Sequence, residues 1–501
     1  MESFVTTVAL IGIVIVIASL LSGAIERTGL PLVPIFLLLG AALGPAGLGI
    51  TNVGFHSPAL HALAMLGLAL LLFSDAVTID TKQLRARRFM LWRLLGPGTL
   101  VPAVLTALAA WVLLDLPGPA AAILGAALAS TDPVLLRTVL RSRALPEASR
   151  IALRLETGMN DVALLPIVIL SMLFIPGRGE ILAASTSSGT EVGRSILGLF
   201  VLGPGLGAFV GWAGITALES VRTRTGVRRD YESLYALGLA FTSFAVAEAV
   251  GGSGFVAAFV AGLVVAAKDI ELCDCFLEYG EATAEMLLLL TFVALGMSLI
   301  WLGLTILDWR TVLFAVIALF VRPVVLYPVL GGVNLSDRDR RLVAAFGPRG
   351  LSSLLLALLP VFAGVTGGER IFMLTSVVVL LSVIVHGGGT AYFLRASALR
   401  DRAISPAPAS DLDVGAPEVL VPLARTAAAS APADDKITID ELRALKESGE
   451  EVTIVDARAP RNFDGDPLIA RGAVRVRPDD PVRDAKELRL SKHATLVIYC
   501  A

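Results

Sequence analysis

The stretch ALASTDPVLLRTVL, residues 127–140, places an aspartate and a proline side by side inside an apolar run that reads as a membrane-spanning helix. Pro133 has no N–H group and its ring clashes with the preceding turn, so the carbonyl of Ala129 loses its helical partner. The residue before a proline, here Asp132, is pushed away from helical dihedral angles. We therefore expect the helix to open at this point and to present free carbonyls, the Thr131 hydroxyl and the Asp132 carboxylate.

The composition of the whole chain is that of a polytopic membrane protein. Hydrophobic residues make up 55% of the 501 positions and charged residues only 17%, which is more apolar than a soluble chain requires for its core. Because a spanning helix takes about 20 apolar residues, the predicted fold class is an all-α membrane protein with about thirteen helices. The candidate segments are 5–24, 31–47, 58–77, 91–115, 119–141, 147–174, 193–219, 230–250, 252–267, 283–304, 311–333, 340–363 and 369–394.

Lys and Arg are concentrated in alternate loops, which predicts the topology because positive residues mark cytoplasmic loops. The N-terminus is expected outside and the C-terminus in the cytoplasm, in a multi-pass protein of the plasma (inner) membrane. No Lys or Arg precedes Arg27 and no cleavage site follows the first apolar run, so we expect that run to remain as a helix. The basic loops carry Arg27, Lys82, Arg85, Arg87, Arg88, Arg137, Arg141, Arg143, Arg150, Arg222, Arg224, Arg228, Arg229, Lys268, Arg338, Arg340, Arg341, Arg395, Arg400 and Arg402.

A second interruption lies in AAFGPRGLSSLLL, residues 344–356, where Pro348 and Arg349 break the twelfth segment. The fifth and twelfth segments are seven crossings apart and therefore run in opposite directions. Prolines are common in transmembrane helices and would explain either break alone, but here a charged residue accompanies both. The pattern favours two inverted repeats with crossed broken helices and a transport site near the membrane midplane.

The sixth segment, RLETGMNDVALLPIVIL at residues 154–170, carries polar groups on two faces. Thr157 and Asp161 are four residues apart and share one helix face, whereas Glu156 and Asn160 form a second pair about 100° away. Ionisable groups inside a membrane are costly and generally belong to functional or paired sites. This helix can therefore contribute to two neighbours at once.

We expect the pair on the first face to lie against the opened strand at Thr131 and Asp132. The pair on the second face is expected to lie against the second break, where Arg349 can neutralise Glu156. Such a pair either holds the core together or takes part directly in the site, and the sequence leaves both roles open.

The motif STDP followed by ETGMNDV resembles the paired signature of the monovalent cation:proton antiporters of the CPA1 type, the NhaP-like sodium/proton exchangers. In that family the second motif usually reads Ser-Glu-Ser-Gly-x-Asn-Asp-Gly. The likeness covers roughly residues 1–396 and extends through LLLFSDAV, AVAEAVGGSGFVAAFVAGL, FVALGMSL, VRPVVLYP, FGPRGLSSLLLALL and VIVHG.

This resemblance implies a thirteen-helix membrane domain, residues 1–402, that forms a homodimer in the lipid bilayer. Segments 1–3 and 7–10 would form the dimer domain, and segments 4–6 and 11–13 would form a core domain that moves like an elevator. The implied function is secondary active exchange of a monovalent cation for a proton by alternating access, with no enzymatic reaction, no cofactor and no nucleic-acid partner.

The resemblance also assigns roles to individual residues. Asp161 looks like the carboxylate that binds cation and proton in turn, with Thr131 and Asp132 as further cation ligands from the unwound helix. Thr157 takes the place of the usual serine and adds a methyl group beside the ion, and Val162 replaces a glycine. These departures leave the choice among Na+, Li+ and K+ open.

Four other positions match residues that orient the site. Asn160 and Glu156 match the orienting pair, Arg349 the arginine that partners this glutamate, and Arg322 the arginine of the preceding helix. Asn160 stands where electrogenic relatives carry a second aspartate, so we expect electroneutral one-for-one exchange. The histidines, His386 included, are expected to lie away from the site.

After Arg402 the composition changes to an Ala-, Pro- and Ser-rich tether, residues 403–436, followed by an α/β pattern at 437–501. The stretches TIVDARAPRNFDGDPLIARGAV and ATLVIYCA resemble a partial rhodanese-like domain, with Cys500 as the persulfide cysteine and Asp456 and Arg458 as the usual strand end. Only Ala501 follows the cysteine, so we expect no sulfur transfer from this chain. Either the natural polypeptide continues, or the tail has a regulatory or docking role toward a cytoplasmic partner.

Two other functions remain to be weighed. A sodium-coupled symporter of an organic anion could use a related inverted-repeat fold, but three carboxylates against one nearby arginine favour a cation as cargo. A membrane-tethered rhodanese-type sulfurtransferase or redox sensor would need the helices only as an anchor, and paired broken helices argue against that.

Overall fold

The computed structural model divides the chain into two units, Met1–Ser410 and Asp411–Ala501. It describes residues 32–45, 47–49, 53–79, 87–142, 145–175, 188–224, 229–268, 274–333 and 335–404, strands at 452–457, 472–476 and 495–499, and a few single positions elsewhere. Cys500 and Arg458 lie outside the described residues. The first unit is helical, which confirms the predicted all-α membrane class.

Predicted segments two to thirteen each coincide with one described helix or a run of consecutive helices. The first segment lies almost wholly outside the described residues, so the total of thirteen stays a prediction. The elements are α2 (Leu32–Leu43), α3 (Pro58–Val77), α5 (Arg88–Leu95), α6 (Pro97–Leu114), α7 (Gly118–Ala129), α8 (Pro133–Arg141), α9 (Glu147–Met172), α10 (Ser188–Leu197), the π-helix η1 (Gly198–Leu202), α11 (Gly203–Arg224), α12 (Arg229–Ala249), α13 (Gly254–Ala267), α14 (Asp274–Met297), the 3-10 helix η2 (Ile300–Ile306), α15 (Trp309–Val329), α16 (Asp337–Ala345), α17 (Leu351–Phe362) and α18 (Gly368–Ile404).

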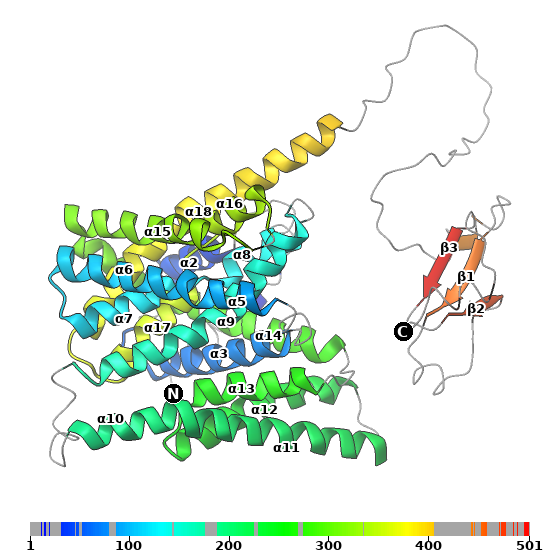
Figure 1. Cartoon of the computed structure of the whole chain (residues 1–501), viewed down its shortest axis with the longest axis horizontal. Coiled ribbons are helices and arrows are strands. Elements are labelled where there is room, and N and C mark those ends of the chain that lie inside the picture. The colour runs from blue at the N-terminus through cyan, green and yellow to red at the C-terminus, as the bar shows by residue number, and fades with distance from the viewer. Residues whose placement is uncertain are drawn as a thin grey trace, which may run out of the picture. The chain divides into compact units, whose positions relative to one another are not determined.

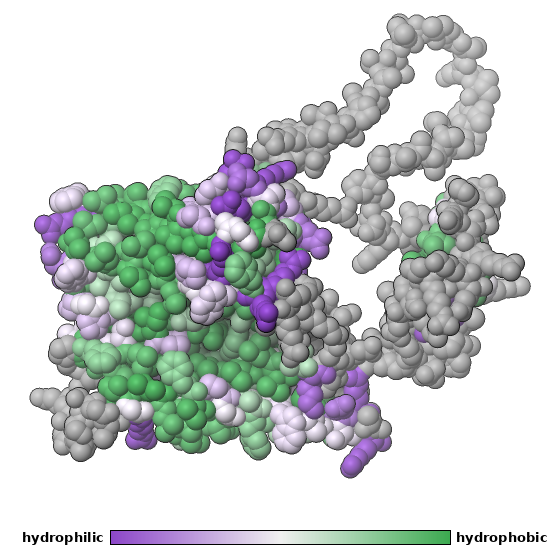
Figure 2. Space-filling model, in the orientation of Figure 1, coloured by the Kyte–Doolittle hydropathy of each residue, from purple (hydrophilic) through white to green (hydrophobic). Residues whose placement is uncertain are grey.

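The outer surface of this unit suits a bilayer. Within the described part, seven helices are long and apolar enough to cross a membrane, and an eighth span forms if α14 and η2, bent by 40°, are taken together. Figure 2 shows a broad hydrophobic surface over the helices, with hydrophilic residues gathered toward helix ends. Helix α18 continues to Ile404, past the expected end of the membrane domain at 402, because its last turns are rich in Leu, Ala and Arg, which favour helix.

The described helices fall into two groups, each packed mainly within itself. In the first group α11 and α12 pack on α13, which lies on α3, and α14 packs on α2 and α3; in the second, α6 packs on α7 and α15, and α7 on α9. Figure 1 shows α11, α12 and α13 at one edge of the unit and α6 and α15 at the other. The groups meet where α3 contacts α9 and where η2 contacts α18. Their expected roles as dimer domain and mobile core stay predictions.

The second unit contains a parallel three-stranded sheet in the order β2-β1-β3, made of β1 (Val452–Asp456), β2 (Ala473–Arg475) and β3 (Thr495–Tyr499). These strands agree with the α/β pattern expected at 437–501. No residue of β3 is buried, and Leu496 and Ile498 are 46% and 60% exposed. Asp456 is buried and pairs with Arg475 at 3.3 Å. A rhodanese-like identity stays a prediction.

Glycines allow α2 and α14 to pack with their backbones in contact. A Cβ atom added at Gly296 would lie 2.4 Å from the carbonyl oxygen of Leu37, and one added at Gly40 would lie 2.3 Å from that of Val293. Small residues at such crossings are how membrane helices gain close van der Waals packing. This crossing therefore depends on both glycines.

We predict that Gly296→Ala separates α2 from α14 and lowers stability by about 1–3 kcal/mol, the usual cost of overpacking. The matched control is Gly238→Ala in α12, where an added Cβ meets nothing within 4 Å. Both changes bring the same gain in helix propensity. Thermal unfolding in detergent should show a lower melting temperature only for Gly296→Ala, and equal behaviour of the two variants would contradict this packing.

Candidate functional site

The two predicted helix breaks are present, and they meet. Helix α7 ends at Ala129 and α8 begins at Pro133, while α16 ends at Ala345 and α17 begins at Leu351. The segments between them have no regular secondary structure, and Asp132 N–H donates to the carbonyl of Pro348 at 3.0 Å. The crossing expected from the sequence is thus confirmed, and it lies among buried residues rather than against lipid.

Asp132 caps two half-helices at once. Its Oδ1 accepts hydrogen bonds from the N–H groups of Val134 at 2.7 Å and Leu135 at 3.1 Å, in the first turn of α8. Its Oδ2 accepts from the N–H of Leu351, the first residue of α17. A larger residue at position 350 would clash with this carboxylate, because a Cβ atom added to Gly350 would lie 2.2 Å from Asp132 Oδ2. Asp132 therefore satisfies orphan donors at both N-termini.

Two arginines donate hydrogen bonds to carbonyls at the C-terminal ends of α7 and α16, the helices that stop at the two breaks. Arg349 Nη1 donates to the carbonyls of Ala129 at 2.7 Å and Ser130 at 2.8 Å, where α7 stops. Arg322 Nη1 donates to the carbonyl of Ala344 at 2.7 Å, where α16 stops. Both arginines are almost completely buried. Carbonyl groups that the breaks leave without helical partners are thereby paired with fixed positive charge.

The expected ion pair between Glu156 and Arg349 is not the one formed. Glu156 instead accepts from Arg322, whose Nη2 lies 2.7 Å from Oε2 and 2.8 Å from Oε1 and whose Nε lies 3.0 Å from Oε1. The guanidinium of Arg349 donates to the carbonyls of the first break instead, so Arg322 rather than Arg349 is the partner of Glu156. The residue spacing along α9 predicts which face of the helix carries Glu156, but it does not predict which arginine packs against that face.

Asp161 contacts the first break through Ser130, which is not among the predicted ligands. Ser130 Oγ donates to Asp161 Oδ1, whereas Thr131 Oγ1 lies 3.4 Å from Glu156 Oε1. Asp161 therefore lies against the opened segment, as expected, but its hydrogen bond there is to Ser130 rather than to Thr131. Asp161 itself is only 4% exposed.

The remaining predicted ligand, Thr157, makes its hydrogen bonds within its own helix. Its hydroxyl donates to the carbonyl of Leu153 on its own helix at 2.9 Å. It also lines a cavity of about 410 Å³ together with Asp75, Pro133, Arg137 and other residues, so its place is on the approach to Asp161.

The buried charges around the crossing balance except for one. Each helix end carries about half an elementary charge, so Asp132 offsets the two positive N-termini. Arg349 and Arg322 offset Glu156 together with the two negative C-termini. Asp161 then remains as a single negative charge, and no Lys or Arg of the described residues forms a salt bridge with it. One proton or one monovalent cation would complete the balance.

Several buried polar atoms near this carboxylate have no hydrogen-bond partner among the described residues. They are both side-chain atoms of Asn160, the hydroxyl of Ser352 and Nε of Arg349. Leaving a buried donor or acceptor unpaired costs about 1–3 kcal/mol. These atoms leave unused hydrogen-bonding capacity beside Asp161, which a water molecule or an ion could satisfy. The predicted packing of Asn160 against the second break therefore has no hydrogen bond to support it.

Two cavities lie at opposite ends of the interface between α3 and α9. The cavity that holds Thr157 is lined by Asp75 near the end of α3 and by Arg154 near the start of α9. The other, about 350 Å³, is lined by His61 near the start of α3 and by Met172 at the end of α9. Asp161 lies in the middle of α9, between the two.

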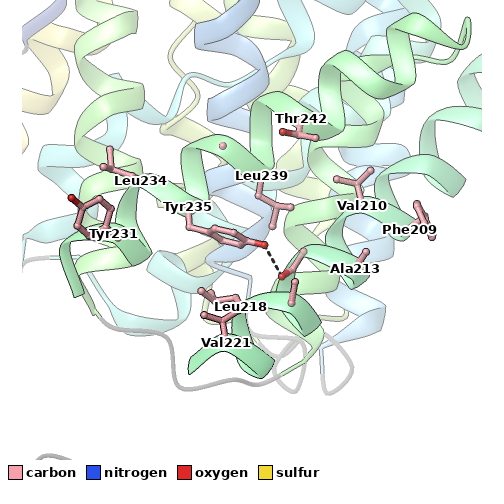
Figure 3. A pocket seen from close by; sticks show the side chains of 13 residues that line it. Phe209, Val210, Ala213, Leu218, Val221, Tyr231, Leu234, Tyr235, Leu239 and Thr242 are labelled. Carbon is pink, nitrogen blue, oxygen red and sulfur yellow. Dashed lines mark hydrogen bonds between the residues drawn. The ribbon is translucent and has the colours of Figure 1, made fainter. Parts of the chain in front are cut away.

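A larger cavity, about 710 Å³, lies between α11 and α12, but its lining does not suit a cation. Figure 3 shows mainly aliphatic and aromatic side chains, and Tyr235 donates its hydroxyl hydrogen to the carbonyl of Gly214 at 2.8 Å. None of the described residues that line it carries a carboxylate. The crossing remains the candidate site.

Two further side chains near the site were not found from the sequence. Ser130 could have been recognised because it directly precedes Thr131 in the opened strand. His386 was expected away from the site, but its Nδ1 lies 3.1 Å from Ser382 Oγ, which accepts from the N–H of Arg349 at 2.7 Å. Only the packing of α18 on α17 brings His386 this close.

Fold and site together define a multi-pass membrane protein with a buried, uncompensated carboxylate at the crossing of two broken helices. Residues 13–396 match the family described as sodium/hydrogen exchanger, transmembrane, and the chain belongs to this family.

Individual relatives agree with this membership. The chain is 28% identical over 383 residues to the K+/H+ antiporter NhaP2 of Shewanella sp. strain MR-4, covering 74% of this chain and 63% of that protein. It is 24% identical to the K+/H+ antiporter NhaP of Alkalimonas amylolytica, covering 77% of this chain and 66% of that protein. The fold is similar to that of the sodium proton antiporter MjNhaP1 from Methanocaldococcus jannaschii, with a TM-score of 0.62 at 22% identity, covering 80% of this chain and 99% of that one.

We predict that Arg322→Met strongly destabilises the protein, by about 3–5 kcal/mol, because it leaves Glu156 charged, buried and unpaired. Glu156→Gln should also destabilise, and the double variant should melt well above the temperature expected if the two losses simply added. The control is Arg310→Met, which breaks the exposed pair with Asp115 at 3.0 Å and should change the melting temperature little. Additive losses in the double variant would show that the two residues do not act as a pair.

Proposed function

We propose that this protein exchanges one monovalent cation for one proton across the plasma membrane. The observation that carries the proposal is the single uncompensated charge of Asp161 inside an otherwise balanced, buried site. The charged carboxylate binds a cation and the protonated one does not, so cation and proton compete for the same oxygen atoms. This competition couples the two gradients. The relatives named as K+/H+ antiporters support the same activity.

The proposed transport cycle uses the two cavities in turn. The larger of the two, about 410 Å³, reaches Thr157 from the helix ends that carry Arg137 and Arg154, the side that the positive-inside rule places in the cytoplasm. The other lies at the opposite ends of the same helices. Sliding of the second helix group against the first, like an elevator, would move Asp161 from one cavity toward the other. The first group would hold the homodimer together.

Electroneutral exchange is part of the proposal. Asp161 is the buried carboxylate left without a compensating charge, and its neighbour on α9 is the neutral amide of Asn160. One carboxylate carries one cation in one direction and one proton in the other, so no net charge moves.

The cation is Na+, Li+ or K+. Hydroxyl and carboxylate oxygens suit all three, and Thr157 narrows the approach by one methyl group compared with a serine. One relative, from Zygosaccharomyces rouxii, is named a Na+/H+ antiporter and two others are named K+/H+ antiporters. The cation selectivity is therefore tested by measuring exchange with Na+, Li+ and K+ separately.

The alternative as a symporter of an organic anion is less well supported. Such cargo needs spare positive charge at the crossing, and both buried arginines are occupied, Arg322 by Glu156 and Arg349 by two carbonyls. The alternative as a sulfurtransferase rests on Cys500, which lies outside the described residues. Only cation exchange accounts for the uncompensated charge of Asp161 at the crossing.

We predict that Asp161→Asn abolishes exchange, because an amide can neither release a proton nor compensate a cation. Reconstituted vesicles with an imposed pH gradient and a fluorescent pH indicator would measure the response to Na+, Li+ and K+. Asp115→Asn, at an exposed position far along the chain from the site, should exchange normally. Folded Asp161→Asn protein that still dissipates the gradient would refute the proposal.

We also predict that the exchange rate does not respond to membrane voltage. Proteoliposomes carrying wild-type protein would be given potentials of either sign while proton flux is followed at fixed ion gradients. Liposomes containing a protonophore serve as the control, since their proton flux must follow the voltage. A rate that rises and falls with the imposed potential would mean that net charge moves in each cycle.

A further inference from the structure

We propose that Ser352, in the first turn of the second broken helix, is a ligand of the transported cation and helps to set cation selectivity. This inference rests on the proposed function, because it names a further oxygen atom in the same site. It adds α17 to the elements that hold the ion, beside the opened strand of α7 and helix α9.

The first turn of α17 packs directly against the unwound segment between α7 and α8. Leu351 N–H donates to Asp132, and Ser353 Oγ lies 3.5 Å from the carbonyl oxygen of Ser130. Ser352 is between these two contacts, and its side chain lies next to the Asp161 carboxylate without the geometry of a hydrogen bond. Ser130 Oγ, Ser352 Oγ and Asp161 therefore face one small space.

The hydroxyl of Ser352 is unpaired among the described residues, although the residue is 1% exposed. Other buried hydroxyls on membrane helices here avoid this cost by donating to their own backbone: Ser376 donates to the carbonyl of Phe372 at 2.9 Å and Thr375 to that of Ile371 at 2.8 Å. Ser352 has no such acceptor, because the carbonyl four residues earlier belongs to Pro348, lies outside the helix and already accepts from Asp132 N–H.

A cation gives this hydroxyl its missing partner. Alkali ions are bound by hard oxygen ligands, and serine offers two lone pairs. The positive N-terminus of α17 would ordinarily repel a cation, but Asp132 caps that terminus and removes most of the repulsion. The ion would then be held by Asp161 from α9, Ser130 from the first break and Ser352 from the second, which ties both broken helices to α9 when the site is loaded.

The test is the cation dependence of proton exchange in proteoliposomes for Ser352→Ala and Ser352→Cys, both of which remove the ligand oxygen. We expect KM to rise about tenfold for the preferred ion, the change that corresponds to one lost contact of about 1.4 kcal/mol, while the maximal rate at saturating cation stays close to that of wild type. The ratios of KM among Li+, Na+ and K+ should also change, because ions of different radius depend differently on ligand number.

The controls separate a ligand from a merely structural serine. Ser376→Ala removes an equally buried hydroxyl that donates within its own helix and should leave KM and ion ratios unchanged. Ser352→Thr keeps the oxygen and should keep KM near the wild-type value.

An unchanged KM for Ser352→Ala, or a rise that is the same for all three ions, would overturn this inference while leaving the proposed function intact. Wild-type protein that exchanges no cation would instead refute the proposed function itself.

Discussion

Neutralisation of four helix ends at one crossing is the constraint on which the rest of this structure depends. In the membrane interior a helix end leaves backbone groups without partners and a partial charge without solvent. One carboxylate, Asp132, serves both N-termini. Two guanidinium groups, those of Arg349 and Arg322, serve the C-termini. Each of these side chains is buried at the crossing, so the broken helices and their charges form a single arrangement in which no member can be removed alone.

The function that we propose depends on the one charge at the crossing that this arrangement does not neutralise. Glu156 offsets Arg322, and the helix ends offset the remaining fixed charges, so that Asp161 alone is free to change its charge state. The same balance explains why a cation can approach the N-terminus of α17. In the proposed cycle, the cavities at the two ends of the α3–α9 interface would supply the paths, and the boundary between the two helix groups would be the surface along which one group moves.

Several partners at the site differ from those expected from helix periodicity, and the differences have one cause. Spacing along α9 predicts which residues share a face, but not how far the helix is rotated or which neighbour meets that face. Arg322 comes from α15, far along the chain, and reaches Glu156 through packing alone. Ser130 rather than Thr131 meets Asp161 because extended residues alternate in direction, so a shift of one residue turns a side chain to the other side.

The sequence by itself determined the membrane class, the positions of the two broken helices and the polar residues gathered there, because each depends on local chemistry. An apolar run of sufficient length indicates a membrane span, and a proline within it removes a backbone hydrogen-bond donor. A charged side chain inside a span requires a partner. The tertiary structure decided which charge neutralises which helix end, which carboxylate remains uncompensated and which serine of the second break lies beside it. These depend on distances between segments that are remote in the chain, and only the packed arrangement of the helices fixes those distances.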